Sequence, residues 1–325
     1  MTSSKIAARS SGDGAEGPQD KARRFVGVVG LGHMGRAFAS NLVADGYSVS
    51  VYDRDTEKAQ SIAGARAATD MAGLAGCEVI ISSVPDDNAL SAVALSSGGL
   101  IEIMKPSAVH ISMSTVSPEI SRRVAEAHQS HGQAYVAAPV LGNPDLANAR
   151  KLFVLAGGRR AVLEQVRPLL ESLGQRLFII GEDPASANLM KLGGNVLTAT
   201  TLESMGEVLA LLRKGGIDQR LAFDVLTNSL FDSHVHKTYG GKIVEERYRP
   251  AGMVVPLAVK DVRLALAEAE RTSVPMPFAS LVHDRLVSIV ARGWGDLDWS
   301  ALGLLISQDA GLESGAALND LTHQR

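Results

Sequence analysis

A glycine turn that joins a strand to a helix near the N-terminus restricts the fold of this 325-residue chain more than any other feature. The apolar run Phe25–Val29 is typical of a strand, and Met34–Asp45 has the composition of a helix. At their junction, Gly30 permits a tight turn, Gly32 lets the backbone approach a bound group closely, and Gly35 lets the helix pack on the strand. The segment therefore predicts the first strand–turn–helix unit of an α/β domain.

This turn has the features of a pyrophosphate site. The N-terminus of the following helix exposes unpaired backbone N–H groups and the positive end of the helix dipole, both of which favour phosphate. A second predicted strand, Ser48–Tyr52, ends at Asp53, about twenty residues past the turn, where an acidic side chain typically accepts the hydroxyls of an adenosine ribose. The cofactor-binding residues predicted in the turn are Gly30, Leu31, Gly32, His33, Met34 and Gly35. We therefore expect bound NAD or NADP.

The residues after the second strand bear on the choice between these two cofactors. Asp53 favours the free ribose hydroxyls of NAD and repels a 2′-phosphate, whereas Arg54 can bind that phosphate. Because Arg54 stands between Asp53 and Asp55, the sequence favours NAD slightly.

The composition excludes several classes of protein. With 46% hydrophobic and 21% charged residues, the chain is long and balanced enough for two soluble domains. A net charge of −3 with scattered basic residues argues against nucleic-acid binding, and no apolar run is long enough to span a membrane. The single cysteine, Cys77, cannot form an intrachain disulfide and is expected to be a small buried side chain. We therefore expect a cytoplasmic protein.

Strands alternate with helices through the first half of the chain. Further strands are predicted at Val79–Val84, Ala108–Met113, Tyr135–Ala137, Phe153–Ala156 and Leu177–Ile180. This alternation predicts an α/β fold with a Rossmann-type, doubly wound, mostly parallel sheet over residues 25–184. Residues 1–24, rich in Ser, Gly, Ala and charge, are expected to be a disordered tail without a signal peptide.

An all-α domain is predicted over residues 185–313, with a tail at 314–325. It begins with a nearly unbroken helical segment, Ala185–Lys214, which we expect to join the two domains. Beyond it, helical periodicity recurs at Gln219–Ser229, Val259–Arg271, Ala279–Gly293 and Leu302–Gln308. A substrate is expected in the cleft between the domains, outside the carboxyl ends of the parallel strands.

Lys191 and Asn195 stand four residues apart in the long helix, so that an amine and an amide share one helical face. An amine beside a reacting oxygen can accept or donate a proton if burial or a positive neighbour lowers its pKa. The alternative is a solvated helix surface, which is the more common place for a single lysine.

Five motifs together point to one family. In chain order they are Gly30–Gly35, Ser114–Pro118, Ala138–Asn143, Lys191–Asn195 and Lys260–Asp261. In the order and spacing of these motifs, the chain resembles the β-hydroxyacid dehydrogenases, which include 3-hydroxyisobutyrate dehydrogenase. The resemblance covers the chain from Phe25 to about Gly311. The segment Gly295–Ser300 resembles most the glyoxylate/succinic semialdehyde reductase branch.

The resemblance implies roles for the residues of the long helix and its partners. Lys191 would be the catalytic acid/base, and Asn195 would hold the substrate and orient Lys191. Lys260 would close over the cofactor, with Asp261 as its structural partner.

The resemblance also implies roles for two loops. Val84 and Pro85 would lie beside the cofactor ribose, Thr115 would face the nicotinamide, and Ser114 would contact the substrate. Ser114 and Thr115 also precede a helix start at Ser117, where capping is an alternative role.

The predicted substrate loop departs from the family pattern. The family has Pro-Val-Ser-Gly-Gly, in which a hydroxyl and successive N–H groups bind a carboxylate, whereas this chain has Leu141, Gly142, Asn143 and Pro144. One hydroxyl is lost and the proline contributes no N–H, so that the Asn143 amide would compensate only in part. We expect substrate size or carboxylate affinity to differ from those of the named relatives.

His234 and His236 form the only His-x-His pair. No Asp, Glu, His or Cys cluster accompanies them in the sequence, so we expect a loop that lines the cleft and no metal site.

The leading hypothesis is an NAD(P)-dependent oxidoreductase that acts on a short hydroxy acid or aldehyde acid and forms a homodimer or homotetramer. An imine reductase is one alternative, against which Lys191 argues, since such relatives generally carry Asp or Tyr there. A catalytically silent dimeric interaction module is another; Leu141 favours it, and the intact Lys191 and Asn195 count against it.

Overall fold

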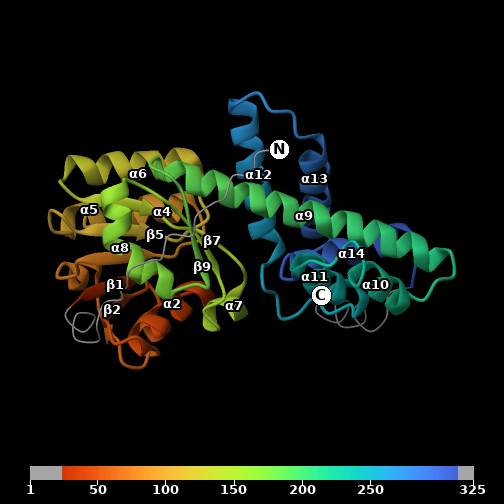
Figure 1. Ribbon diagram of the computed structural model, residues 1–325, viewed down its shortest axis with the longest axis horizontal. Coiled ribbons are helices and arrows are strands. Elements are labelled where there is room, and N and C mark those ends of the chain that lie inside the picture. The colour runs from red at the N-terminus through yellow and green to blue at the C-terminus, as the bar shows by residue number, and fades with distance from the viewer. Residues whose placement is uncertain (1–23, 314–325) are drawn as a thin grey trace, which may run out of the picture.

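The computed structural model describes residues 24–313 and divides them into a sheet domain and a helical domain (Figure 1). The two predicted tails, 1–24 and 314–325, therefore lie outside the described residues, apart from Arg24. The sheet domain has helices on both faces of a central sheet, and the long helix α9 runs from it into the helical domain (Figure 1).

The sheet confirms the predicted Rossmann-type architecture. Its strand order is β3-β2-β1-β4-β5-β6-β8-β7, with β9 paired to β8. The strands are β1 (Phe25–Val29), β2 (Ser48–Tyr52), β3 (Arg66–Ala67), β4 (Val79–Ser82), β5 (Val109–Ser112), β6 (Ala134–Ala137), β7 (Val140–Leu141), β8 (Phe153–Gly157) and β9 (Arg176–Gly181). All pairs from β3 through β6 are parallel, so the carboxyl ends of β1, β4 and β5 meet at one edge.

Strand β8 runs opposite to this direction, antiparallel to both β6 and β7. The connection from β7 to β8 contains only one short helix, α7 (Pro144–Asn148). A parallel crossover needs a dozen or more residues, usually with a helix that spans the sheet, so this short connection returns the chain in the opposite direction. The strand β7 itself, only two residues long, is absent from the sequence-based prediction.

Helices cover both faces of the sheet. On one face lie α2 (His33–Ala44) and α8 (Arg160–Ser172), whose apolar side chains join those of the central strands in the largest buried cluster. On the other face lie α4 (Asp87–Leu95), α5 (Leu100–Ile103) and α6 (Pro118–Ser130). The short elements α3 (Thr56–Gln60) and η1 (Met71–Leu74) complete this domain.

The helix α9 (Pro184–Lys214) is shared by both domains, as its composition predicts. Its 31 residues span about 45 Å at the usual rise of an α-helix. The first turns pack on β6, β8 and β9, and the later turns pack on the helices of the second domain. A single rigid element therefore fixes where its side chains stand relative to both domains.

The second domain is all-α, as predicted. It contains α10 (Gln219–Thr227), α11 (His234–Val244), α12 (Val255–Arg271), α13 (Pro277–Ala291), η2 (Trp299–Ala301) and α14 (Leu302–Asp309). Its main buried cluster joins α9 to α12, α13 and α14. No helix of residues 24–313 is long and apolar enough to cross a membrane.

The expected loop at His234 and His236 is wrong, because both histidines lie in the first turn of α11. Ser233 caps this helix by accepting the N–H of His236, a start signal that the glycine-rich middle of the segment obscures. Within residues 24–313, no three His, Cys, Asp or Glu side chains are placed to hold a metal ion.

A buried polar chain crosses the sheet domain where the sequence predicts only strand and helix. The Ser82 hydroxyl contacts His110, His110 contacts His128 at 2.8 Å, and His128 contacts Gln133 at 2.7 Å. Burial lowers the pKa of His128 to about 4, so that both rings pack as neutral groups. Cys77 is buried as expected, and burial raises the pKa of its thiol to about 11.

Candidate active site

The glycine turn has the shape that a pyrophosphate requires. Gly30 has φ +84°, and a Cβ added there would lie 2.3 Å from the Ser83 carbonyl oxygen. A Cβ at Gly35 would lie 1.9 Å from the Gly30 carbonyl oxygen. Within residues 24–313, a Cβ at Gly32 would meet nothing within 4 Å, and no side chain caps the N-terminus of α2. The turn thus leaves open space in front of free helix N–H groups, which fits a bound phosphate.

Asp53 lies beside this turn and is bonded to it. Its Oδ2 accepts the N–H of Leu31 at 2.6 Å, and its Oδ1 accepts the N–H of Asp55 at 2.9 Å. A carboxylate has about four acceptor sites, so two remain for ribose hydroxyls. The Arg54 side chain is exposed at the same strand end. Asp53 therefore positions the glycine turn in addition to its predicted role.

The loops after β4 and β5 meet at the same edge of the sheet. The Ser114 hydroxyl accepts the N–H of Val84 at 2.9 Å, and Ser114 is buried. The next turn is fixed by Asp87, whose carboxylate accepts the N–H of Ser117. Ser114, predicted to contact substrate, thus has a structural partner in the Val84–Pro85 loop.

Lys260 connects the helical domain to both loops. Its ammonium donates to the Thr115 carbonyl at 2.5 Å and to the Pro85 carbonyl at 2.9 Å. It also pairs with Asp261 at 2.9 Å. Lys260 therefore closes the edge where the predicted cofactor-binding residues of the two loops stand.

Lys191, Asn195 and Asp261 form a buried hydrogen-bonded chain. The Lys191 ammonium donates to Asn195 Oδ1 at 2.9 Å, and Asn195 Nδ2 donates to Asp261 Oδ2 at 2.5 Å. The exposed fractions are only 8%, 5% and 2%, so the solvated helix surface is excluded. The bond from Asn195 to Asp261 fixes the amide with its oxygen toward the lysine.

This environment changes the acidity of Lys191. Burial lowers the pKa of Lys191 from 10.5 to about 8 because the charged form loses its hydration. The negative charge of Asp261 acts in the opposite direction, and the positive charge of Lys260 lowers the pKa further. The amine can therefore exist in both protonation states near neutral pH.

The departure from the family pattern determines the contacts of the predicted substrate loop. The Leu141 side chain packs against α9, where a Cβ at Gly194 would lie 2.7 Å from Leu141 Cδ2. Gly142 has φ +138°, and the Asn143 side-chain oxygen caps α7 by accepting the N–H of Leu146 at 2.9 Å. This cap directs the Asn143 oxygen toward α7 and leaves both N–H groups of its amide without a partner in the hydrogen bonds of the described residues.

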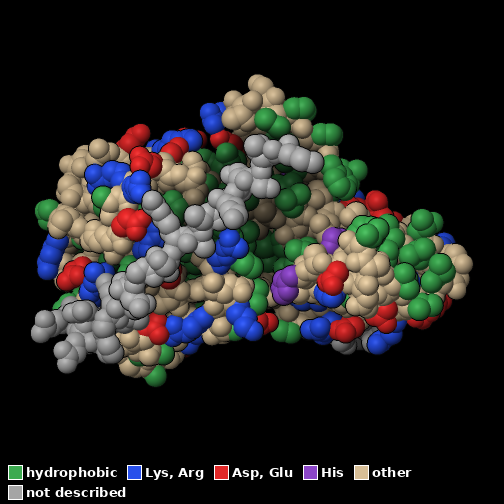
Figure 2. All heavy atoms as spheres, in the orientation of Figure 1, with side chains coloured by type: hydrophobic (Ala, Val, Ile, Leu, Met, Phe, Trp, Pro, Cys, Tyr) green, Lys and Arg blue, Asp and Glu red, His purple; other side chains and the backbone are tan. Residues whose placement is uncertain are grey.

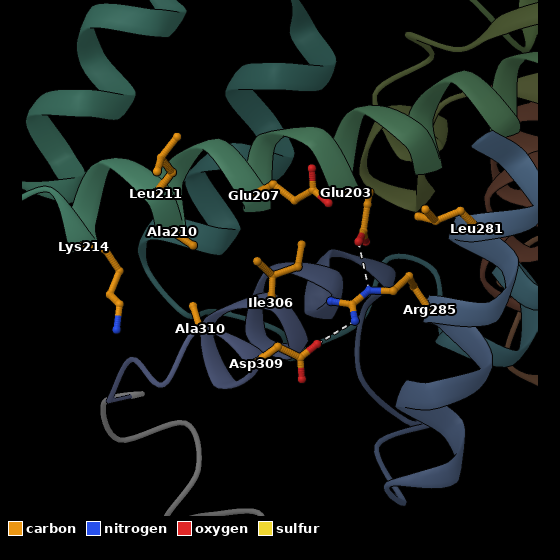
Figure 3. Close-up of a pocket in the computed structure, with 10 residues that line it drawn as sticks. All are labelled: Glu203, Glu207, Ala210, Leu211, Lys214, Leu281, Arg285, Ile306, Asp309 and Ala310. Carbon is orange, nitrogen blue, oxygen red and sulfur yellow. Dashed lines mark hydrogen bonds and ion pairs between the residues drawn. The ribbon is translucent and has the colours of Figure 1, made fainter. Parts of the chain in front are cut away.

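A groove of about 580 Å³ lies elsewhere in the helical domain, between α9, α13 and α14 (Figure 3). Arg285 crosses it, bonded to Glu203 on one side and Asp309 on the other (Figure 3). Glu203 lies twelve residues beyond Lys191 on the same helix, or about 18 Å along the axis. We locate the candidate active site at Lys191 because the buried chain and the cofactor loops meet there.

Sequence reasoning did not identify the role of Asp261 at this site. The Lys260–Asp261 pair is visible in the sequence, but helical periodicity cannot show that α12 crosses α9 at Asn195. Only a homologous structure or covariation between positions 195 and 261 would have revealed the contact.

Two family models match almost the whole described chain. Residues 25–181 match the NAD-binding domain of 6-phosphogluconate dehydrogenase, and residues 185–306 match the model described as NAD-binding of NADP-dependent 3-hydroxyisobutyrate dehydrogenase. The chain is 37% identical over 280 residues to an uncharacterised oxidoreductase, YfjR, of Bacillus subtilis, covering 85% of this chain and 98% of the relative. The chain belongs to the β-hydroxyacid dehydrogenase family.

Other relatives agree with this assignment. The β-hydroxyacid dehydrogenase described here is 32% identical over 282 residues to glyoxylate/succinic semialdehyde reductase 1 of Arabidopsis thaliana, covering 85% of this chain and 96% of the plant protein. Its fold is shared by 3-hydroxyisobutyrate dehydrogenase from Salmonella typhimurium, with a TM-score of 0.78 and 24% identity over 87% of this chain and 99% of the other. It is therefore an oxidoreductase with NAD(P)-binding domains.

The charges around Lys191 can be tested without substrate. We expect Asp261→Asn to lower the pKa of the Lys191 amine below about 8 and Lys260→Met to raise it, because the first variant removes a negative neighbour and the second a positive one. The pH dependence of labelling by an amine-selective reagent, followed by mass spectrometry at Lys191, measures both pKa values. Lys214, at the far end of α9, is the internal control. An unchanged Lys191 midpoint in Asp261→Asn would refute this description of the site.

Proposed function

We propose that this dehydrogenase transfers a hydride between NAD(P) and a short hydroxy acid or aldehyde acid, with Lys191 as the general acid/base. The observation that carries the proposal is the buried chain from Lys191 through Asn195 to Asp261, in which the pKa of the lysine falls to about 8. An acid/base group is most effective when its pKa lies near the working pH.

The direction of proton transfer follows from this pKa. Above about pH 8 the Lys191 amine is mostly neutral and can accept the proton of a substrate alcohol. Below it, the ammonium predominates and can donate a proton to the oxygen of a carbonyl. Alcohol oxidation should therefore increase as pH rises through this value, and carbonyl reduction should increase as pH falls.

The remaining residues position the reactants. When bound, the nicotinamide supplies or accepts the hydride. The glycine turn and Asp53 would hold the dinucleotide, while Lys260 keeps the Pro85 and Thr115 loops in place beside it. Asn195 would bind the substrate oxygen with the part of its amide that Asp261 and Lys191 leave available.

The silent-module alternative has less support. A chain without a catalytic task has no need to keep an ammonium buried in contact with an amide and a carboxylate, since burying a charge costs free energy. Leu141 changes the substrate loop and its packing on Gly194, but no hydrogen bond of the described residues joins this loop to Asp261.

The first test removes the proposed acid/base. Lys191→Ala should lower kcat by roughly 10²–10⁴, the usual share of general acid–base catalysis, while the melting temperature and NAD(P) affinity stay close to those of the unaltered protein. Steady-state kinetics on the best substrate from a panel of hydroxy acids and aldehyde acids measures the effect. Lys214→Ala is the matched control. A variant with near-normal kcat would overturn the assignment, and a change confined to KM would indicate a binding role alone.

The second test concerns the preference for NAD over NADP. We propose a modest preference for NAD, because the Asp53 carboxylate would repel a 2′-phosphate by about 1–2 kcal/mol at surface dielectric. Asp53→Asn should shift kcat/KM toward NADP, and Arg54→Ala should shift it toward NAD. A clear NADP preference in the unaltered protein, unaffected by Asp53→Asn, would show that Arg54 dominates.

We also propose that the helical domain forms a homodimer. Apolar side chains gather on the end of this domain that carries α10 (Figure 2). From position 197 onward, the large exposed apolar side chains on α9 and α10 are Leu197, Val208, Leu211, Leu221 and Val225. Single exposed apolar residues are common, but several on adjacent helices favour coverage by a partner, for which a second copy of the chain is the simplest choice.

The dimer is tested by mass. Light scattering at micromolar concentration should give at least twice 34.2 kDa. Leu211→Glu with Leu221→Glu should reduce the mass to that of one chain, whereas Arg167→Glu on the sheet domain should not. A single-chain mass for the unaltered protein would refute the proposal.

A further inference from the structure

Lys242 of α11 is a nearly buried cation that the proposed mechanism does not use. Its side chain is 14% exposed and its ammonium lies 2.8 Å from Asp298, which is fully buried. An ammonium has three N–H groups. Among the described residues, Asp298 is the acceptor within hydrogen-bond distance, and the Tyr239 ring lies 5.5 Å away.

Asp298 holds this ammonium in a fixed place. The same carboxylate oxygen that contacts Lys242 also accepts the N–H of Gly252 at 2.9 Å. The other oxygen accepts the hydroxyl and the N–H of Ser300. Asp298 therefore ties α11, the loop before α12 and η2 together, and Lys242 cannot move far without breaking this set of bonds.

Lys242 lies close to the substrate loop of the other domain, and Gly252 is next to both. A Cβ built at Gly252 would lie 3.7 Å from the Lys242 ammonium nitrogen and 4.0 Å from Asn143 Cβ. The ammonium nitrogen and Asn143 Cβ thus lie close to the same point beside Gly252, where its Cβ would stand. Since Asn143 belongs to the loop that in the family binds the substrate carboxylate, Lys242 lies at the far end of that loop.

The loop contacts the helical domain at two places. Leu141 packs against α9 at Gly194, next to Asn195, and Asn143 stands beside Gly252 and Lys242. Two residues of backbone separate these places, which is at most about 7 Å. The loop therefore lies between α9 at Gly194 and the Lys242 ammonium.

The loop itself has few groups left for an anion. Leu141 has no hydroxyl and Pro144 has no N–H, so that the Asn143 NH₂ group is the side-chain donor that remains in the loop. The Lys242 ammonium, which has one acceptor among the described residues, has N–H groups left that can donate to a carboxylate. A carboxylate attached directly to the reacting carbon, as in a two-carbon acid, would remain beside Asn195. Two more methylene groups add about 2.5 Å of reach toward Lys242.

We propose that Lys242, held by Asp298, binds the substrate carboxylate and selects acids whose carboxylate is separated from the reacting carbon by two or more carbons. This inference rests on the proposed function, because it names the substrate class of the same site. It assigns the recognition that the family loop usually provides to a cation on the opposite domain.

The experiment compares an aldehyde with and without the remote carboxylate. In the unaltered protein, kcat/KM for succinic semialdehyde should exceed that for butanal, which has the same chain length. Lys242→Met should reduce the ratio of these two values by about 10- to 100-fold, mainly through KM, since a charge-assisted hydrogen bond is lost. Lys214→Met, which removes a lysine from the distant groove, should leave the ratio unchanged.

Lys242→Met leaves Asp298 buried without its cation and can unfold the protein. The double variant Lys242→Met/Asp298→Asn removes both charges and should show the same fall in the ratio, with a melting curve as the check on folding. If kcat/KM stays the same or falls equally for both aldehydes in the double variant, the ratio is unchanged. That result would show that the ion pair only holds the loop in place and would overturn the proposal.

Calorimetry separates this inference from the proposed function. Binding of 4-hydroxybutyrate should weaken by about 10-fold or more in the double variant, whether or not any compound is turned over. If no substrate reacts but this loss is measured, the proposed reaction fails while the carboxylate site is supported. If turnover is observed and 4-hydroxybutyrate binds equally to both proteins, the carboxylate site is refuted while the proposed reaction stands.

Discussion

The hydrogen bond between Asn195 and Asp261 is the interaction on which the proposed chemistry depends. It joins α9 to α12 and fixes the amide of Asn195. It also places the Asp261 carboxylate two hydrogen bonds away from the buried Lys191 ammonium. Without that charge, burial of Lys191 would drive its pKa lower still, because desolvation and Lys260 both oppose the protonated form. Lys191 thus retains a proton near neutral pH but loses it readily as the pH rises. The crossing of α9 and α12 sets these protonation properties because it brings Asp261 to Asn195.

The same crossing sets the relation between the two domains. Lys260 is adjacent to Asp261 on α12, and its ammonium contacts carbonyl groups at the carboxyl ends of two parallel strands. Since α9 is continuous through both domains, any displacement of α12 would alter the Lys191 environment and the cofactor loops together. One helix pair therefore couples the site of proton transfer to the site where the dinucleotide would lie.

The sequence predicts what depends on neighbours in the chain. The glycine turn, Asp53 and the shared face of Lys191 and Asn195 follow from local spacing, and the structure contains each of them. The cap that starts α11 was obscured by glycines within the helix, and its histidines were misplaced in a loop. Contacts between distant segments, such as His110 with His128 and Lys242 with Asp298, have no periodic signature and could not be predicted.

The departure from the family pattern lies in the loop at residues 141–144. Leu141 and Asn143 shape a loop that depends on β7 and the cap of α7, whereas the proton-transfer chain depends on α9 and α12. The two sets meet where Leu141 packs on Gly194, and the charged groups that shift the pKa of Lys191, Asp261 and Lys260, both lie outside the loop. Under the proposed function, substrate binding and proton transfer therefore depend on different residues, and Lys242 on α11 would bind the carboxylate in place of a serine.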